Sequence, residues 1–445
     1  MTTVVSSSFE PHRQLLFISS LAIIGLVSQS WGTPVFVATF LTLNYFTLAY
    51  TNVSPEVRRI LLYSNWTVLP IGFFLLQING YIGVLSSGRP LTTANSVWML
   101  GLPFYFLSVL SLNHEIQSGK LQRPRWLDYV LYGVYFPKFL SGPLEQPALL
   151  QKLSGFRFTL NREAFASGSD WLVLGLFCKF IIAHYLAKNV HAFELVRAPS
   201  IFLSVCAFEL QVYFDLSGYS FMAIGISEML GIPLTNNFAH PFFAGNIGAF
   251  WRRWHISLGR WFHQYVYTPV RALDPSSPRI KLFLPLLVFL LSAAWHGITL
   301  NFLVWGLWHG LAYLAYMQLF SRRKWPVAVA VPSLVFVLVV GRFLFMEPDF
   351  HALMLKLSRL LSWTAWSEGV ASMRLADFDI GQRGGFDFWI AATLSGSYLL
   401  MEYLNQKFAL PAYAIFRQPK VQWALILLGL LLIEGGTNGF IYARQ

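Results

Sequence analysis

The sequence FWRRWHISLGRWFHQYVY, residues 250–267, and the shorter sequence SAAWHG, residues 292–297, place two histidines in strongly apolar surroundings. His255 and His296 each follow a tryptophan directly. An ionisable side chain at membrane depth costs roughly a few kcal/mol or more unless a partner or water relieves it. Because histidine titrates nearest neutral pH, it is the side chain best suited to move a proton there. These two residues are therefore the first candidates for chemistry.

The composition predicts an all-α polytopic membrane protein. The 445 residues are 56% hydrophobic and 12% charged, whereas soluble proteins carry about 25% charged residues. Apolar runs long enough to span a bilayer give about 11 transmembrane helices. They lie near 14–31, 34–50, 60–78, 95–112, 170–188, 199–230, 281–299, 302–320, 326–346, 386–404 and 421–436.

The segment 128–145 differs from these runs because glycine, proline and lysine interrupt its aromatic residues. Such breaks are tolerated at membrane depth only where protein or a wet cavity surrounds the backbone. We therefore expect a re-entrant or broken helix there. The whole chain, 1–445, is interpreted as one transmembrane domain, with N-terminal helices in 1–127, a catalytic core in 128–320 and C-terminal helices in 321–445.

The net charge of +12 fits basic loops that contact lipid headgroups better than it fits nucleic-acid binding. Basic residues of the short early loops, such as Arg13 and Arg125, favour an N-terminus on the cytoplasmic side. Glu10 and the lack of a small-residue cleavage site indicate a retained first helix. Cys178 and Cys206 fall in apolar runs, so neither a disulfide framework nor a thiolate metal site is expected.

Helical spacing organises the block 250–267 into two sides. Aromatic and aliphatic residues from Trp251 to Tyr265 recur every three or four positions, and Arg253, Ser257 and Arg260 fall on another side. The block is too charged to span and too aromatic to be solvated. It is expected to lie along the membrane interface or to dip into the protein, with its aromatic side buried and its arginines available to lipid phosphates.

Upstream, residues 209–232 carry Glu209, Asp215 and Glu228 in an otherwise apolar span. Buried carboxylates there should pair with the arginines of 252–260 or be protonated. Ser217, Gly218, Tyr219 and Ser220 after Asp215 indicate a helix break, although residues 199–230 could also form one long helix. An ion pair is the simplest role for Asp215 itself.

Downstream, Trp308-His309-Gly310 repeats the pattern Trp295-His296-Gly297. On one continuous helix thirteen residues turn about 1300°, which leaves the two histidines roughly 140° apart. They would share one site only if Gly297 and Asn301 broke the helix. Small residues before His296 allow close helix approach, so His296 is the preferred base and His309 a packed histidine.

Several motifs are absent from the sequence. It has no P-loop, no GxGxxG and no GxSxG nucleophile elbow. His114-Glu115 begins an HExxH motif, but Ser118 stands where the second histidine would be. We therefore expect no bound metal, ATP or dinucleotide.

Taken together, four elements resemble the membrane-bound O-acyltransferase family, in its bacterial polysaccharide-modifying branch. They are YFDLSGYSFMAIG from Tyr213, NFAHPF from Asn237, FWRRWHISLGRW from Phe250, and the tract 292–310 that ends in GLWHG. FPKFLSGP from Phe136 and the terminal GGTNGFIYARQ add to the likeness. Within that branch the likeness is greatest to subunits that O-acetylate alginate.

The resemblance implies helices around a central tunnel, with His296 as the catalytic histidine and His255 as a second one. No cofactor would be bound, and acetyl-CoA would be the acyl donor. The acceptor would be an extracytoplasmic polysaccharide such as alginate, cellulose or peptidoglycan, reached through a periplasmic SGNH-type acetyltransferase, and the protein would sit in the bacterial inner membrane. The candidate substrate-binding residues are Arg252, Arg253, Trp254, Ser257, Asp215, Tyr219, Trp295 and Asn301.

After the histidine block the sequence departs from the family pattern WxRDYxYxPLGG. WFHQYVYTPVRAL has His263-Gln264 for the Arg-Asp pair and Arg271-Ala272 for the double glycine. This leaves the acceptor open, and D-alanyl transfer to teichoic acid-type polymers remains an alternative. A transporter or flippase is the alternative of another class, because intramembrane acids and broken helices suit it equally.

Overall fold

The computed structural model describes residues 10–27, 32–47, 102–139, 142–297, 299–320, 325–373 and 386–433, with a few positions between 54 and 64. Every regular element within these ranges is a helix, as the composition predicts. In chain order the α-helices are α1 Glu10–Val27, α2 Gly32–Thr47, α5 Leu102–Gln117, α6 Trp126–Val134, α7 Phe136–Phe139, α8 Leu149–Ser154, α9 Arg162–Leu176, α10 Ala183–Val190, α11 Ala198–Met229, α12 Ile247–Arg253, α13 Ile256–Phe262, α14 Thr268–Leu273, α15 Pro278–His296, α16 Leu300–Ala315, α17 Val327–Met346, α18 Phe350–Leu361, α19 Trp363–Ser372, α20 Phe386–Lys407 and α21 Pro419–Leu432.

Helices form at the predicted apolar runs wherever the structure describes them. Residues 61–63 and 65–78 of one predicted run, and the terminal GGTNGFIYARQ, lie outside the described residues. Four described helical runs are long and apolar enough to cross a membrane: Arg162–Leu195, Ala198–Met229, Pro278–His296 and Ala328–Met346. The membrane character is thus supported, while the number of crossings, the tunnel and the single-domain interpretation stay predictions.

The segment 128–145 contains a broken helix, as its glycines and prolines predict. Helix α6 ends at Val134, and α7 follows as a separate element of 4 residues. Between them Tyr135 leaves the helical region, with ψ of 105°. A Cβ on Gly133 would lie 2.5 Å from Leu41, so this glycine permits close packing of α6 on α2. The break is confirmed, and its depth in a membrane stays a prediction.

The predicted break after Asp215 is wrong, because α11 runs unbroken for 32 residues. Gly218 has a different role. A Cβ there would lie 2.8 Å from the backbone nitrogen of Lys179 and 2.9 Å from the carbonyl oxygen of Gly175. The glycine therefore lets α11 approach the Gly175–Lys179 backbone, as small residues do between membrane helices. Lys179 lies in η3 Phe177–Ile182, a π-helical turn that joins α9 to α10.

The chain forms two compact units. One comprises Met1–Leu172 and Met222–Thr235, and the other Val173–Phe221 and Asn236–Asn438. The first unit has an apolar core around Tyr129 and Leu131 of α6. Within it Arg13 of α1 binds the buried Asp128 of α6, with 2.6 Å between Nη1 and Oδ1. This basic residue is thus paired inside the protein.

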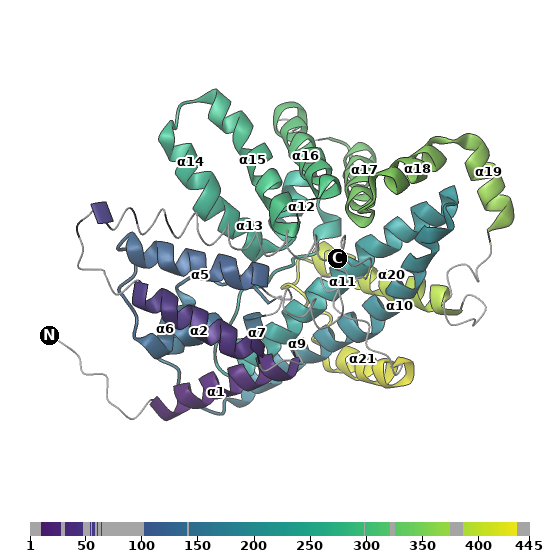
Figure 1. Cartoon of the computed structure of the whole chain (residues 1–445). Coiled ribbons are helices and arrows are strands. Elements are labelled where there is room, and N and C mark those ends of the chain that lie inside the picture. The colour runs from purple at the N-terminus through teal and green to yellow at the C-terminus, as the bar shows by residue number, and fades with distance from the viewer. Residues whose placement is uncertain are drawn as a thin grey trace. The chain divides into compact units, whose positions relative to one another are not determined.

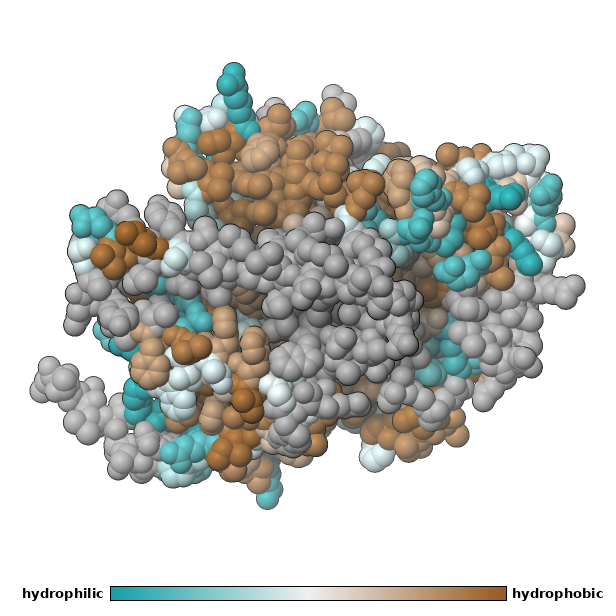
Figure 2. Space-filling model, in the orientation of Figure 1, coloured by the Kyte–Doolittle hydropathy of each residue, from teal (hydrophilic) through white to brown (hydrophobic). Residues whose placement is uncertain are grey.

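The second unit contains the candidate site. Its helices α15, α16 and α17 lie side by side in Figure 1. Gly306 of α16 fits against the carbonyl oxygen of Phe289 in α15, where a Cβ would be only 2.9 Å away. Figure 2 shows apolar side chains gathered over α15 and α16. Phe283 of α15 and Leu311 of α16 are both exposed. An outward apolar surface of this kind suits contact with lipid.

Candidate functional site

The block 250–267 is not the single helix that its aromatic spacing predicts. Helix α12 ends at Arg253, Trp254 is extended with φ −104° and ψ 126°, and α13 begins at Ile256. His255 between them has φ +45°, in the left-handed region. The predicted sides hold in part: Trp254 and Trp261 are buried. Helical periodicity therefore predicted that the tryptophans are buried, but it did not predict the corner at His255.

His255 is buried at this corner, with 7% of its surface exposed. Its ring lies 6.3 Å from the ring of Phe238, centroid to centroid. Its carbonyl oxygen accepts the backbone hydrogen bond of Gly259 at 3.1 Å and so begins α13. The corner thus turns His255 into the protein, which is the second of the two positions expected for this block.

His296 is the last residue of α15 and is enclosed by aromatic rings. The nearest ring centroids belong to Trp295 at 4.8 Å, Phe345 at 5.2 Å and Trp305 at 5.5 Å. Gly297 follows in an extended conformation, and a Cβ there would lie 2.7 Å from the ring of Phe302. The imidazole therefore stands at a helix end, partly buried among aromatic side chains.

Charged groups lie beside this enclosure. Arg342 of α17 lies against the Phe345 ring, which is one of the rings around His296. The Nε of Arg342 donates to Oε2 of Glu209 at 2.5 Å, and both side chains are largely buried. The Arg342 guanidinium lies 5.4 Å from the centre of the Phe345 ring. Arg342 and Glu209 were not predicted as site residues, and no short motif signals a pairing across 133 positions.

The acids of α11 do not bind the arginines of 252–260, so that prediction is wrong. Glu209 binds Arg342, Asp215 binds Lys179 of η3, and Glu228 accepts a hydrogen bond from Ser167. Each partner is a nearby group on a helix that packs against α11. Asp215 is thus held in a structural ion pair, as its expected role required.

His309 cannot be set aside on helical geometry alone, because the helix is interrupted between the two histidines. Helix α15 ends at His296 and α16 begins at Leu300. Both histidines contact Trp305, with centroid distances of 5.5 Å and 5.0 Å. Packing nevertheless supports a structural role for His309, because a Cβ on Gly341 would overlap its imidazole ring. His309 is therefore wedged against the backbone of α17.

The remaining predicted substrate-binding residues divide into two groups. Trp295 and Asn301 lie at the His296 enclosure, and Asn301 also donates to the carbonyl of Phe345 at 3.5 Å. Arg253 instead binds the Phe243 carbonyl at 3.2 Å and Gln406 at 3.1 Å. Arg252 is exposed on α12. Trp254 and Ser257 are buried beside His255, and Tyr219 lies partly buried on α11.

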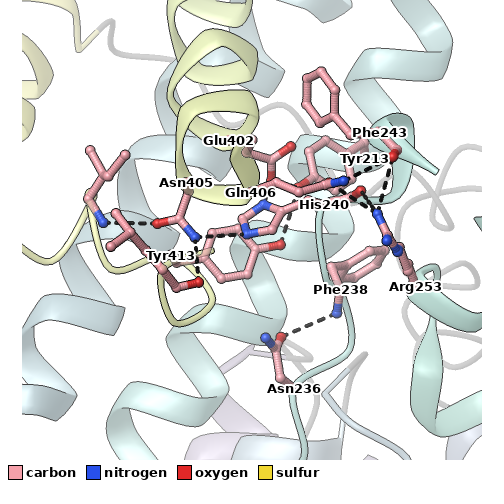
Figure 3. A network of polar contacts seen from close by, with 12 residues as sticks. Tyr213, Asn236, Phe238, His240, Phe243, Arg253, Glu402, Asn405, Gln406 and Tyr413 are labelled. Atoms are coloured by element: carbon pink, nitrogen blue, oxygen red, sulfur yellow. Dashed lines mark hydrogen bonds and ion pairs between the residues drawn. The ribbon is translucent and has the colours of Figure 1, made fainter. Parts of the chain in front are cut away.

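Sequence reasoning missed a buried polar network that joins α11, the 236–244 segment and α20 (Figure 3). At its centre Glu402, which is fully buried, accepts a hydrogen bond from the Tyr213 hydroxyl and lies 3.2 Å from His240 Nδ1. Asn405 lies 3.3 Å from the other ring nitrogen of His240. His240 and Tyr413 both have positive φ, at 54° and 62°. In the sequence, only an acidic residue within an apolar run, Glu402, indicates that a polar network is present.

Within the described ranges, no group of three or more histidines, cysteines and acids is placed to hold a metal ion. The long apolar helices indicate an integral membrane protein, and two of its histidines, His255 and His296, lie at helix ends among apolar side chains. The chain belongs to the membrane-bound O-acyltransferase family, whose family model matches residues 14–340. It is therefore an acyltransferase, and the resemblance seen in its motifs is confirmed.

Its relatives act on different polymers, by their names. A probable alginate O-acetylase of Pseudomonas putida KT2440 is 27% identical over 89% of this chain and 83% of its own length. A peptidoglycan O-acetyltransferase of Helicobacter pylori 26695 is 31% identical over 62% of this chain and 52% of its own. A teichoic acid D-alanyltransferase of Bacillus subtilis 168 is 26% identical over 58% and 71%.

Proposed function

We propose that this acyltransferase moves an acetyl group from cytoplasmic acetyl-CoA through a membrane tunnel, for O-acetylation of an extracytoplasmic polysaccharide. Two of the three relatives described above are named for O-acetylation of envelope or secreted polymers. The observation that carries the proposal is the position of His296, at a helix end, among the rings of Trp295, Trp305 and Phe345, with Arg342 against Phe345. The protein would act in the bacterial inner membrane.

Acyl transfer to a hydroxyl needs a base and a group that steadies the developing oxyanion. In the proposed reaction, a nitrogen of neutral His296 takes the proton of the acceptor hydroxyl as its oxygen attacks the thioester carbonyl. The carbon–sulfur bond then breaks, and the leaving thiolate takes the proton from the imidazolium. The products are the acetyl ester and coenzyme A, and His296 is neutral again.

His255 would orient the thioester or stabilise charge on its carbonyl oxygen, because it is a buried histidine of the candidate site. The exposed Arg252 of α12 suits the phosphates of the donor, since guanidinium groups bind phosphate bidentately. Arg253 is less suited to that role than the sequence suggested, because its guanidinium already binds the Phe243 carbonyl and Gln406. Trp295 and Asn301 would line the acyl position.

The acceptor hydroxyl would belong to the glycan itself or to a periplasmic SGNH-type acetyltransferase that passes the group on. Acetyl-CoA is cytoplasmic and the glycan lies outside, so the proposed tunnel moves the acyl group without exporting the donor. D-alanyl transfer is the second candidate, because one relative is named for it. It requires a donor other than acetyl-CoA.

The test uses purified full-length protein, acetyl-CoA labelled in the acetyl group and a small hydroxyl acceptor. Wild-type protein should release coenzyme A and label the acceptor, and His296→Ala should do neither while remaining folded. His351→Ala is the matched control, because His351 is an exposed histidine of α18. Unchanged transfer by His296→Ala would refute the assigned base. Binding of acetyl-CoA without thioester cleavage by wild type would favour a carrier, and turnover of a D-alanyl donor alone would favour the second candidate.

A further inference from the structure

The segment 236–240 lies against the corner that carries His255. The backbone nitrogen of Ile256 donates to the carbonyl oxygen of Asn237 at 2.9 Å, and that of Ser257 donates to Asn237 Oδ1 at 3.1 Å. The backbone nitrogen of Ala239 donates to the carbonyl oxygen of Arg253 at 3.0 Å. The segment therefore binds the chain directly before and directly after the corner.

Asn237 does for α13 what an N-cap residue usually does. The first N–H groups of a helix have no partner within the helix, and a side chain at the N-cap normally accepts from them. Here the N-cap position is His255, whose side chain makes no capping bond. One residue, distant by 18 positions along the chain, supplies both acceptors instead.

Asn237 is itself held firmly. It is 1% exposed, and its Nδ2 donates to the hydroxyl of Ser220 on α11 at 3.1 Å. At the other end of the segment, the contact between His240 Nδ1 and Glu402, at 3.2 Å, and the hydrogen bonds from Arg253 to the 240–243 turn hold the chain (Figure 3). The acceptors of Asn237 are thus fixed relative to α11 and α20.

The conformation of His255 needs this support. A left-handed φ is disfavoured for residues with a Cβ and persists only where the surroundings hold it. The hydrogen bonds to Ile256 and Ser257 fix the two residues that follow His255, and the bond to Arg253 fixes the chain before it. Without them the corner can relax toward a continuous helix, which would turn the His255 ring away from its present position.

We propose that Asn237 is a positioning residue for His255, which it holds in the orientation that serves acyl transfer. This rests on the proposed function of the two histidines. Asn237 touches no reacting atom in the proposal and acts through the corner alone. A displaced catalytic group lowers the rate of the chemical step while the binding of the donor is retained.

The test is a double-mutant cycle of Asn237→Ala with His255→Ala in purified full-length protein, measured as single-turnover transfer from labelled acetyl-CoA. Asn237→Ala should lower the rate by up to about 100-fold in the wild-type background, because misplacement by about 1 Å can cost that much. KM for acetyl-CoA should stay within about twofold. In the His255→Ala background the same substitution should cost almost nothing, since the two changes then remove one contribution.

Two further variants separate positioning from folding. Asn237→Asp keeps the Oδ acceptor for Ser257 and should restore most of the rate. Asn189→Ala is the matched control: Asn189 is 2% exposed and its Nδ2 donates to the Tyr185 carbonyl at 2.7 Å, so it should lose stability but keep the rate per folded molecule.

An equal loss from Asn237→Ala in both backgrounds, or no loss in either, would overturn the positioning role. Full activity of His296→Ala would instead overturn the proposed function, which keeps the two failures distinct.

Discussion

Glu209 and Arg342 form an ion pair, and we predict that removing either charge alone strongly destabilises the protein. The two side chains are 9% and 12% exposed, and the distance between Oε2 and Nε is 2.5 Å. Glu209→Gln removes the only carboxylate that binds Arg342 among the ion pairs of the described residues. A buried pair that loses one partner costs about 3–5 kcal/mol, because the other charge stays uncompensated. Glu209→Gln should therefore lower the free energy of unfolding by roughly that amount.

The double variant Glu209→Leu with Arg342→Met should recover most of this loss. Replacing both ions of a buried pair by apolar residues is often neutral to within about 1 kcal/mol, since neither charge must then be desolvated. The free energies are compared by titrating each variant in mild detergent with sodium dodecyl sulfate. The Lys188–Asp387 pair, at 3.0 Å and similarly buried, is the control and should respond in the same way.

The activity of the double variant separates stability from catalysis at this pair. It should be folded yet slow in acetyl transfer, because Arg342 lies against Phe345, which contacts the proposed base His296. The corresponding double variant of Lys188 and Asp387 should keep its rate per folded molecule. The reasoning fails if Glu209→Gln loses less than about 1 kcal/mol, or if the double variant is as unstable as the single one.

Three shorter predictions concern other positions. Gly218→Leu should destabilise the protein by about 1–3 kcal/mol or more, measured by the same titration, because its Cβ would lie 2.8 Å from the Lys179 nitrogen. His309→Asn should fold and keep acetyl transfer in the labelled-donor assay, since the smaller side chain fits beside Gly341 of α17 and no proton transfer is assigned to His309. Hydrogen bonds, first of all from the Ser276 hydroxyl, lower the pKa of Asp274 in the exposed loop before α15. The stability that they give the loop is present above the unfolded pKa of about 4 and is lost as the pH falls through the lower folded pKa. Amide protection in residues 274–277 should therefore decrease only in acid, and Asp274→Asn should remove this pH dependence.

The histidines of the site were accessible to sequence reasoning because their signal is local. An ionisable residue inside an apolar run is visible without any knowledge of the fold, and both His255 and His296 are of this kind. The helices at the apolar runs were predictable for the same reason, since length and apolar composition are properties of one segment. The broken helix around Tyr135 also followed from residues within the segment.

What the sequence missed depends on residues far apart in the chain. Asp215 and Lys179 are 36 positions apart, and Glu209 and Arg342 are 133 apart. Any of several basic residues could have been their partner until the helices were placed. The wrong prediction of a helix break at Gly218 has the same origin. A glycine that permits close helix contact cannot be told from a glycine that breaks a helix until the neighbouring helix is known.

Both candidate histidines lie where a helix is interrupted, so the backbone groups near them need hydrogen-bond partners from outside the helix. His255 lies between α12 and α13, and His296 at the end of α15 before Gly297. Each interruption leaves backbone N–H and carbonyl groups without partners within a helix. Such backbone is tolerated at membrane depth only where protein buries it or water reaches it. At His255 the protein does so, because Asn237 accepts the freed N–H groups.

At the break after His296, the helix start lacks a capping bond from its own N-cap side chain. Gly297 donates to the Ala293 carbonyl, but the N-cap residue of α16, Thr299, makes no side-chain capping bond. Its hydroxyl donates instead to Asn301, at 2.5 Å. The two breaks thus differ in how the following helix start is capped. Asn237 accepts from the N–H groups of Ile256 and Ser257 after His255, whereas the side chain of Thr299 makes no capping bond at the start of α16.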